Sequence, residues 1–503
     1  MSVISRTFFK QARNVPNKPA IYCDENSISY EHLATLVNQW SSALQKKGVQ
    51  HGDHIAILLP NCIEYVALML VAANIGAVLV PLNLSLPPDA IRRACQTTNI
   101  KHIVATADLL QSFCLNQNCQ NDQIFRMNSV IWFLSYQFLN SVKSDSDING
   151  LWIASDDEPF ILTMTSGSTG EPKPIILTQD TKLSRVSAAV EMYKITHTDR
   201  TLVATPLYHS LAERLVLIAL LTGGTSILMP RFSPSEWIRT VEEKLISFTI
   251  AVSSQLSQIA HLLDDETHSQ KVKSLRCVVS SSALLDTKIK ENLISKLNCE
   301  FHECYGTSEI AIATNLSAED AKLKLQSVGK AVPKVKIKIL RENGTIAAPN
   351  EAGEIICKTP MIFSGYYGHP ELTKDAMFGE YFRTGDMGKL DKDGFLYFLG
   401  RKKEIIITGG INVYPIDIES VISECTAVKE SAAFPFPDEK LGEIIAVALV
   451  PKEPEHFKLR TVRFHCAERL ADYQQPRKFF MVKELPKNNL GKIMKHILLS
   501  KYT

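Results

Sequence analysis

Short apolar runs alternate with amphipathic segments along the first part of the chain. The apolar runs have the length and composition of buried strands and cover 54–60, 76–82, 102–107, 160–165, 225–230 and 275–280. Segments with helical spacing of their apolar residues fall between several of them, at 31–46, 63–73 and 180–194. Strands that alternate with helices form βαβ units around a mainly parallel, buried sheet. The pattern therefore predicts an α/β fold with a large N-terminal domain of βαβ-type subdomains.

A different pattern begins near residue 400. Short β-type runs now alternate with helices that start at Pro415, near residue 459 and at Gly491. This is a compact α+β module of about 100 residues, a usual size for a domain. We therefore expect two domains, 1–399 and 400–503, the second a small C-terminal α+β lid. The segment 401–503 holds 17 basic and 13 acidic residues, which suits contact with phosphates, although a solvated basic face is the alternative.

One stretch, 65–82, is apolar enough to be mistaken for a membrane span. Asn74 and Gly76 divide it into a helical half and a β-rich half that ends at Pro81. A bilayer span needs about 20 continuous apolar residues, so a buried helix followed by a core strand is the better interpretation. The first residues are interrupted by basic side chains and lack the apolar core of a secretory signal.

Composition narrows the class of protein. Lys and Arg number 55 against 53 Asp and Glu, which argues against a nucleic-acid groove or an acidic-membrane anchor as the main role. The 11 cysteines are scattered, without the paired spacing of a zinc site. They indicate buried thiols in a reducing compartment, and hence a cytoplasmic protein.

The strongest local feature is a loop rich in glycine and hydroxylated residues. It runs Thr165, Ser166, Gly167, Ser168, Thr169, Gly170, Glu171, Pro172 and Lys173. Glycines let backbone N–H groups approach an anion, hydroxyls add donors and Lys173 adds positive charge, so the loop suits phosphate. It is not a Walker A loop, because a β-type run follows it instead of a helix. Taken alone, such a loop is also typical of a simple turn between two strands.

Further motifs follow in a fixed order. They are Tyr305-Gly306-Thr307-Ser308-Glu309, Tyr381-Phe382-Arg383-Thr384-Gly385-Asp386, Gly400-Arg401-Lys402-Lys403-Glu404 with Gly409-Gly410-Ile411-Asn412-Val413-Tyr414-Pro415, and Leu485-Pro486-Lys487-Asn488-Asn489-Leu490-Gly491-Lys492. In this order and spacing the motifs resemble the adenylate-forming (AMP-binding) superfamily of acyl- and aryl-CoA ligases, peptide-synthetase adenylation domains and firefly luciferase. The resemblance covers nearly the whole chain.

The resemblance implies an ATP site. The 165–173 loop would hold the β- and γ-phosphates, and the other residues placed there are Ser282, Ala283, Glu303, Tyr305, Gly306, Thr307, Ser308, Asp386 and Arg401. Tyr305 would stack on adenine, and Asp386 would accept both ribose hydroxyls with help from Arg401. Ser308 would contact the α-phosphate. Without the resemblance, Tyr305 is equally typical of a core tyrosine and Asp386 of a turn.

The resemblance implies three catalytic residues, Lys492, Glu309 and His209, of which the first two act through their charge. Glu309 would hold Mg²⁺, because a hard cation beside phosphates prefers carboxylate oxygen. Lys492 would stabilise the negative charge that develops when a carboxylate attacks the α-phosphate of ATP, a contact worth about 10²–10³ in rate. Without the resemblance, Lys492 would be a solvent-exposed residue at a helix start and Glu309 a surface carboxylate.

The acyl site would be built around His209, Ser281 and Cys304. It would draw side chains from 209–215, 253–257, 281–284 and 304–314. Members of the superfamily keep a histidine at the His209 position, near the acyl carboxylate, and a core or gating histidine is the alternative. The aspartate that pairs with the ammonium group in amino-acid-activating members is absent, which favours an acid without an α-amino group. Ser281 and Cys304 replace smaller residues, which favours a short, medium-chain or aryl acid.

The second half-reaction needs a thiol at the acyl-adenylate. Lys403 matches the hinge about which the C-terminal domain rotates in the superfamily, and rotation would withdraw Lys492. The same rotation would present the segment around Gly409 and Gly410, which leave room for a pantetheine arm. We therefore predict an AMP-forming carboxylate–CoA ligase that uses ATP, Mg²⁺, CoA and a small carboxylic acid, without integral membrane association.

Three alternatives stay open at this stage. A stand-alone adenylating enzyme would pass its acyl group to a carrier-protein thiol or to an amine, and a luciferase-type oxygenase would use the adenylate differently. A nucleotide-binding protein without activity is suggested by Pro174, where the superfamily usually has glycine, and by Leu490, where it has serine or threonine. The charged residues of the site are all retained, which argues against the last alternative.

Overall fold

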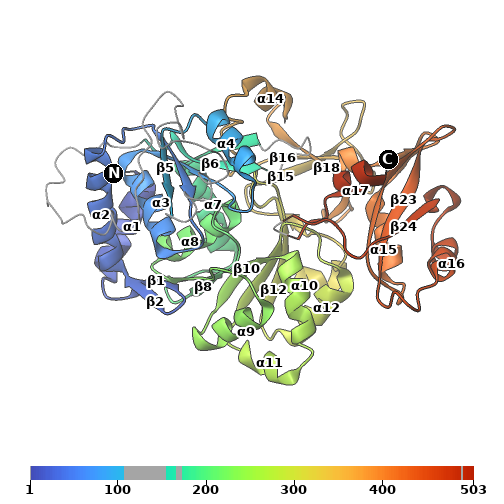
Figure 1. The fold of residues 1–503 in the computed structure, drawn as a ribbon, viewed down its shortest axis with the longest axis horizontal. Helices are drawn as coiled ribbons and strands as arrows, with labels where there is room; N and C mark the ends of the chain where they lie inside the picture. The colour runs from blue at the N-terminus through green and yellow to red at the C-terminus, as the bar shows by residue number, and fades with distance from the viewer. Residues whose placement is uncertain (1, 107–154, 166–172, 489–490, 503) are drawn as a thin grey trace, which may run out of the picture.

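The computed structural model describes residues 2–106, 155–165, 173–488 and 491–502. Three sheets and their helices build a large N-terminal part, and a fourth sheet belongs to a smaller C-terminal part at the right of Figure 1. The expected α/β class, with a large N-terminal and a small C-terminal domain, is confirmed.

The first sheet carries the glycine-rich loop. Its strands, in spatial order, are β5 (His102–Ala105), β3 (His54–Leu58), β4 (Val78–Pro81), β6 (Pro159–Thr165) and β7 (Lys173–Thr178). The first four run parallel, whereas β7 runs antiparallel to β6, with Thr165 paired to Lys173. The loop therefore joins two antiparallel strands, as the sequence predicted. Its residues Ser166, Gly167, Ser168, Thr169 and Gly170 lie outside the described residues.

The second sheet has nine strands. Their spatial order is β14 (Lys330–Ala331), β13 (Thr314–Leu316), β12 (Glu300–Tyr305), β11 (Cys277–Ser281), β10 (Phe248–Val252), β8 (Arg200–Val203), β9 (Thr225–Leu228), β1 (Pro19–Cys23) and β2 (Asn26–Ser29). The six strands from β12 to β1 are parallel, and the strands at both edges are antiparallel. Parallel strands bring their carboxyl ends to one edge, so Ser281 and Tyr305 lie where ligands bind in such sheets.

Helices of the large part pack on and around its sheets (Figure 1). They are α1 (Val3–Asn14), α2 (Tyr30–Lys46), α3 (Ile63–Ile75), α4 (Pro88–Thr97), α7 (Gln179–Met192), α8 (Ser210–Thr222), α9 (Pro234–Glu243), α10 (Ser253–Leu262), α11 (Glu266–Lys271), α12 (Thr287–Lys296), α13 (Ala318–Lys324) and α14 (Pro370–Asp375). The apolar stretch 65–82 divides between the buried helix α3 and strand β4, as predicted. Among the described residues, no helix combines the length and apolar character that crossing a bilayer requires.

A third, antiparallel sheet was not expected from the βαβ pattern. It consists of β15 (Lys336–Leu340), β16 (Gly353–Lys358), β18 (Tyr381–Leu390), β17 (Met377–Phe378) and β19 (Leu396–Arg401). Strand β18 pairs with β19 and places Asp386 opposite Arg401. The sheet therefore positions two of the predicted nucleotide-site residues and ends directly before the predicted hinge.

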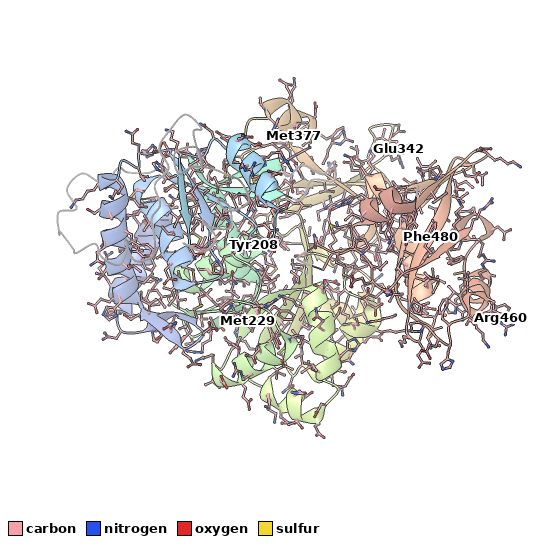
Figure 2. All side chains as sticks on the ribbon, in the orientation of Figure 1. Tyr208, Met229, Glu342, Met377, Arg460 and Phe480 are labelled. Atoms are coloured by element: carbon pink, nitrogen blue, oxygen red, sulfur yellow. The ribbon has the colours of Figure 1, made fainter. Side chains whose placement is uncertain are left out.

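The C-terminal part follows the expected α+β order. Its elements are η1 (Lys402–Glu404), β20 (Ile406–Thr408), β21 (Ile411–Val413), α15 (Pro415–Ser423), β22 (Val428–Asp438), β23 (Gly442–Pro451), α16 (Leu459–Arg469), η2 (Asp472–Gln474), β24 (Lys478–Met481) and α17 (Lys495–Tyr502). Its core includes Phe480, seen in Figure 2, which stacks on Tyr502 with ring centroids 4.1 Å apart.

The start of the terminal helix was wrongly predicted. Helix α17 begins at Lys495 rather than at Gly491, because Gly491 has a φ of +76° and Ile493 forms a bridge with Lys487. A left-handed residue and an extended one cannot belong to an α-helix. Lys492 therefore lies on a loop before the helix.

The expected buried thiols are seen among the described cysteines. Nine cysteines are described, all of them free, and the buried ones are Cys23, Cys95, Cys277, Cys304, Cys357, Cys425 and Cys466. Burial raises the pKa of several of these thiols, so they pack as small apolar side chains in their neutral form.

Candidate active site

Tyr305, Asp386 and Arg401 come together from three strands. The Tyr305 hydroxyl donates a 2.8 Å hydrogen bond to Asp386 Oδ2, and Arg401 Nε lies 2.9 Å from Asp386 Oδ1. Asp386 is only 2% exposed, and burial raises its pKa, although Arg401 and Tyr305 oppose that rise. Its Oδ1 accepts no hydrogen bond from the described residues despite the nearby arginine. This buried, incompletely satisfied carboxylate suits a ligand with hydroxyl donors, such as a ribose.

Lys492 reaches this group from the C-terminal part. Partial desolvation and then repulsion from Arg401 lower the Lys492 pKa, although the side chain stays exposed to solvent. The positive charge of Lys492 in turn acts on the Asp386 carboxylate. The lysine loop is held by its own contacts, because Lys492 N donates 2.9 Å to Asn488 Oδ1 and Asn488 N donates 2.9 Å to Lys492 O. The predicted catalytic lysine thus lies near the predicted ribose carboxylate.

Glu309 follows a tight turn after β12. The Tyr366 hydroxyl donates a 3.1 Å hydrogen bond to Glu309 Oε1, and Lys173 Nζ lies 5.7 Å from the centroid of the Tyr366 ring. The described residues give Glu309 Oε2 no hydrogen bond, and the side chain is half-buried. A carboxylate with one free oxygen, close to a phosphate-loop lysine, fits the donor set of Mg²⁺.

The turn between Tyr305 and Glu309 brings the other motif residues to the same place. Gly306 and Ser308 are exposed, and the Thr307 carbonyl accepts a 2.9 Å hydrogen bond from Ala311 N. An added Cβ at Gly306 would lie 1.6 Å from the Ala311 carbonyl oxygen, so this close approach requires glycine. Thr307 Oγ1 is buried and has no hydrogen-bond partner among the described residues. It is available to a bound ligand.

His209 caps the start of helix α8. Its ring lies against Tyr208, with centroids 4.4 Å apart, and Tyr208 is seen inside the large part in Figure 2. The ring nitrogen Nε2 is buried and has no hydrogen-bond partner among the described residues. Burial lowers the His209 pKa to about 4, so the imidazole is neutral at physiological pH. A neutral, unpartnered imidazole at this position can donate to or accept from a substrate carboxyl group.

Ser281 and Cys304 end two neighbouring parallel strands, β11 and β12. Their side chains hydrogen-bond to each other, and burial raises the Cys304 pKa. Ser282 follows with a φ of +76°, and the Ala283 carbonyl accepts a hydrogen bond from the Ser253 hydroxyl. Two of the three predicted acyl-pocket residues, Ser281 and Cys304, therefore lie together at the carboxyl ends of the strands, in what we call the acyl patch.

Glu303 has a supporting position in the structure. It forms a buried ion pair with Lys290, and its Oε1 accepts a 2.9 Å hydrogen bond from Leu285 N. These contacts hold the 281–285 segment against β12. The structure therefore shows Glu303 positioning that segment, whereas the sequence had placed it among the ATP-binding residues.

The predicted hinge joins the third sheet to the fourth. Lys403 lies in η1, and its neighbour Lys402 forms a 3.1 Å ion pair with Glu354, which also pairs with Arg383 at 2.6 Å. Gly409 and Gly410 have φ values of +56° and +81° and form the turn between β20 and β21. Glycine is the residue that adopts such left-handed backbone angles most easily. The turn therefore carries no side chains at these two positions.

Two features of the site were missed by the sequence reasoning. Tyr366, which binds Glu309, reaches the site because Ile176 N donates 2.9 Å to Gly365 O beside β7. Arg185 on α7 donates to the Glu309 carbonyl at 3.0 Å. Both contacts join residues that are far apart in the sequence, so no local motif predicts them. Pro174 contributes to the same pairing through its carbonyl, which accepts from Tyr367 N at 2.9 Å, so its missing N–H is not needed there.

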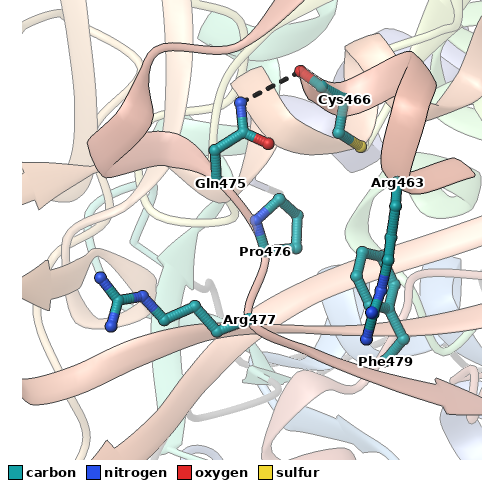
Figure 3. A pocket seen from close by; sticks show the side chains of 6 residues that line it. All are labelled: Arg463, Cys466, Gln475, Pro476, Arg477 and Phe479. Atoms are coloured by element: carbon teal, nitrogen blue, oxygen red, sulfur yellow. Dashed lines mark hydrogen bonds between the residues drawn. The ribbon is translucent and has the colours of Figure 1, made fainter.

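Two hollows on the described surface are lined by residues other than those of this cluster. Figure 3 shows one in the C-terminal part, lined by Arg463, Cys466, Gln475, Pro476, Arg477 and Phe479. Another lies beside the hinge, with Glu354, Lys402 and Tyr414 in its wall. None of the predicted nucleotide or acyl residues lines either of them.

This chain belongs to the AMP-binding enzyme family. The family model described as AMP-binding enzyme matches residues 8–367, and the model of the AMP-binding enzyme C-terminal domain matches residues 417–492. The resemblance to the adenylate-forming superfamily is thereby confirmed.

Several relatives that match nearly the whole chain are CoA ligases. The long-chain-fatty-acid–CoA ligase FadD13 of Mycobacterium tuberculosis (strain ATCC 25618 / H37Rv) is 30% identical over 484 residues, covering 95% of this chain and 93% of that protein. The indoleacetate–CoA ligase of Aromatoleum aromaticum is 29% identical, covering 95% of this chain and 94% of that protein. Among solved structures, the o-succinylbenzoate CoA synthetase MenE of Bacillus subtilis, in complex with its acyl-adenylate intermediate, superposes with a TM-score of 0.86 at 26% identity, covering 98% of this chain and 97% of that one.

Proposed function

We propose that this protein activates a carboxylic acid with ATP to an acyl-adenylate and then transfers the acyl group to CoA. AMP and pyrophosphate leave as products. Family membership and the CoA-ligase relatives support the reaction. One observation carries the assignment: Lys492 of the C-terminal part lies near the Tyr305–Asp386–Arg401 group of the large part. A lysine that can move with the small part is thereby close to the carboxylate that would bind the ribose of ATP.

In the first half-reaction, the residues of the large part bind ATP and the acid. Asp386 accepts the ribose hydroxyls through the oxygen that Tyr305 leaves unoccupied, and Thr307 Oγ1 supplies a further contact. Neutral His209 orients the reacting carboxylate without neutralising it, which keeps the oxygen nucleophilic. Lys492 stabilises the charge that builds on the phosphate oxygens as the carboxylate attacks.

Mg²⁺ would be held by Glu309, whose other carboxylate oxygen accepts no hydrogen bond from the described residues and whose partner Tyr366 lies close to Lys173. When bound, the ion neutralises phosphate charge and fixes the orientation of pyrophosphate as a leaving group. The Tyr366 hydroxyl orients the Glu309 carboxylate for this role.

In the second half-reaction, rotation about Lys403 replaces Lys492 by the Gly409–Gly410 turn. The bare backbone of that turn leaves room for the pantetheine arm of CoA, whose thiol attacks the acyl carbonyl and displaces AMP. The net positive charge of the C-terminal part suits the CoA phosphates. The buried free thiols suit a reducing compartment, and we place the reaction in the cytoplasm.

The test is product analysis with the full-length chain, ATP, Mg²⁺ and a panel of carboxylic acids, with and without CoA. We expect AMP and acyl-CoA in equal amounts, detected by chromatography and mass spectrometry, and only when CoA is present. Release of ADP instead of AMP would contradict the proposal. Acid-dependent pyrophosphate exchange without acyl-CoA would instead indicate an adenylating enzyme with a carrier-protein or amine acceptor.

A further inference from the structure

Arg214 is a buried cation that has no partner among the described residues. Its side chain lies on the second turn of α8, and the residue is only 7% exposed. Its Nε is fully covered and has no hydrogen-bond partner, and the described residues form no ion pair with its guanidinium. Arginine carries five N–H donors in a fixed fork, so an unpaired guanidinium in a protein interior is unusual.

The groups around Arg214 do not neutralise it. Those that act on it most are the Cys304 thiol and the Tyr193 phenol, and burial raises the pKa of both, so they carry no charge near neutral pH. The neighbouring Glu213 is already engaged in a buried ion pair with Lys182. Arg185 adds a second positive charge close by.

Arg185 itself is satisfied, which makes it a useful contrast. It donates to the carbonyls of Met361 and Glu309, each at 3.0 Å. Two buried arginines on adjacent helices therefore differ: Arg185 donates hydrogen bonds to two carbonyls, whereas Arg214 has no partner among the described residues. A buried charge without a partner destabilises a protein, and such groups are typical of sites that a ligand completes.

The place of Arg214 identifies that ligand site. The group that acts most strongly on the Arg214 charge is Cys304, which lies with Ser281 in the acyl patch at the carboxyl ends of the paired strands β11 and β12. His209, the residue expected at the reacting carboxylate, precedes the same helix by one residue. The rise from His209 to Arg214 is about 7 Å along a helix, a separation that is compatible with the two ends of one small molecule.

We propose that Arg214 binds a second carboxylate on the acyl substrate, so that the acid activated by this enzyme is a dicarboxylic acid. The proposal rests on the proposed function and names its substrate class. One carboxylate meets His209 and the α-phosphate, and the other forms a bidentate pair with the buried guanidinium. A site built around an unpaired buried charge rejects an analogue that lacks the matching group, because that charge is then left unpaired.

The test compares matched pairs of acids that differ only in the second carboxylate, glutarate against pentanoate and adipate against hexanoate. Acid-dependent AMP release would be measured for the wild-type chain, Arg214→Met, Arg214→Lys and Arg231→Met, the last a control at an exposed arginine. We expect the wild type to favour the dicarboxylate of its better pair by about 10²-fold in kcat/KM. Arg214→Met should lose that preference, Arg214→Lys should keep part of it and Arg231→Met should keep all of it. A wild type that prefers the monocarboxylates, with an unchanged ratio in Arg214→Met, would overturn the proposal.

If the enzyme turns over no acid in the panel, that result counts against the proposed function alone. A binding measurement then still tests the role of Arg214. Thermal unfolding of the AMP-loaded protein would be followed with glutarate, adipate or their monocarboxylate partners. We expect the dicarboxylates to raise the Tm of the wild type and not that of Arg214→Met. Without ligand, Arg214→Met should unfold at an equal or higher temperature, because it removes an unpaired buried charge. Equal shifts for both acid classes would contradict the role of Arg214, even in an active CoA ligase.

Discussion

Gly491 of the C-terminal part lies directly against Ser254 of the large part. A Cβ at Gly491 would fall 2.4 Å from both Cβ and Oγ of Ser254, closer than any real contact. Ser254 belongs to the first turn of α10, and Gly491 precedes Lys492. The contact therefore determines how far the lysine can enter the nucleotide site, and it links the position of the small part to the chemistry of the first half-reaction.

Gly491→Ala should impair adenylation more than thioester formation. The added methyl clashes with Ser254 only while Lys492 is at the nucleotide site, so we expect a loss of about 10–10² in acid-dependent pyrophosphate exchange. Gly442→Ala is the matched control, because Gly442 has a similar φ of +77° and no atom within 4 Å of its added Cβ. Equal losses in the two variants would show that backbone strain, rather than the contact, is responsible.

Lys492→Ala should abolish acyl-adenylate formation. We expect pyrophosphate exchange to fall by about 10²–10³, since the charge developing on the phosphates loses its partner. Thioester formation from a preformed acyl-adenylate should largely persist, as should ATP binding. Lys487→Ala, on the same loop but paired with Glu430, should leave both steps near wild type. Near-normal exchange in Lys492→Ala would remove this residue from the mechanism.

Lys403→Pro should affect the two half-reactions in the opposite way to Lys492→Ala: it should spare adenylation and block thioester formation. Proline fixes φ at the hinge and removes an N–H, so the C-terminal part can no longer rotate. Pyrophosphate exchange should persist while CoA-dependent turnover is lost. Lys403→Ala, which keeps the backbone free, should retain both activities. Loss of both steps in the proline variant would refute the hinge assignment.

Asp386→Asn should lower the adenylation activity and raise the stability of the fold. Burial raises the folded-state pKa of Asp386, so its contribution to stability is present below the unfolded pKa, about 3.9, and is lost as pH rises through the folded pKa. At pH 8 the charged, buried carboxylate therefore lowers the free energy of unfolding, and Asp386→Asn should raise Tm more at pH 8 than at pH 4. Adenylation should fall sharply because the ribose acceptor is lost. A variant less stable than wild type at pH 8 would contradict the desolvation argument.

His209 should show the opposite pH dependence. Burial lowers its folded-state pKa to about 4, below the ordinary value of about 6.5. The unfolded chain therefore binds more protons between these values, and the free energy of unfolding falls as pH drops from 6.5 towards 4. Removing this titration in His209→Asn should flatten that fall, whereas His197→Asn, at an exposed histidine, should not. Denaturant titrations at pH 5 and pH 7 measure the difference.

The local features of the nucleotide site could be predicted from the sequence. The pairing that sets Asp386 opposite Arg401 belongs to an antiparallel sheet that the sequence pattern did not predict, whereas Thr165 and Lys173 flank a loop between two strands, as predicted. Such features depend on residue types at short spacing and on alternation along one strand, both of which a sequence carries directly. The start of α17 could not be predicted in this way, because the pairing of Ile493 with Lys487 competes with the helical pattern.

The sequence by itself determined the α/β class, the two-part organisation and the set of charged residues that we propose to act on ATP. Only the tertiary structure decided which groups are satisfied: Glu303 is held by Lys290, Glu309 is held by Tyr366, and Arg214 has no partner among the described residues. The physical reason is that desolvation and hydrogen bonding act through space. Their outcome depends on which distant segments meet, and spacing along the chain does not encode that.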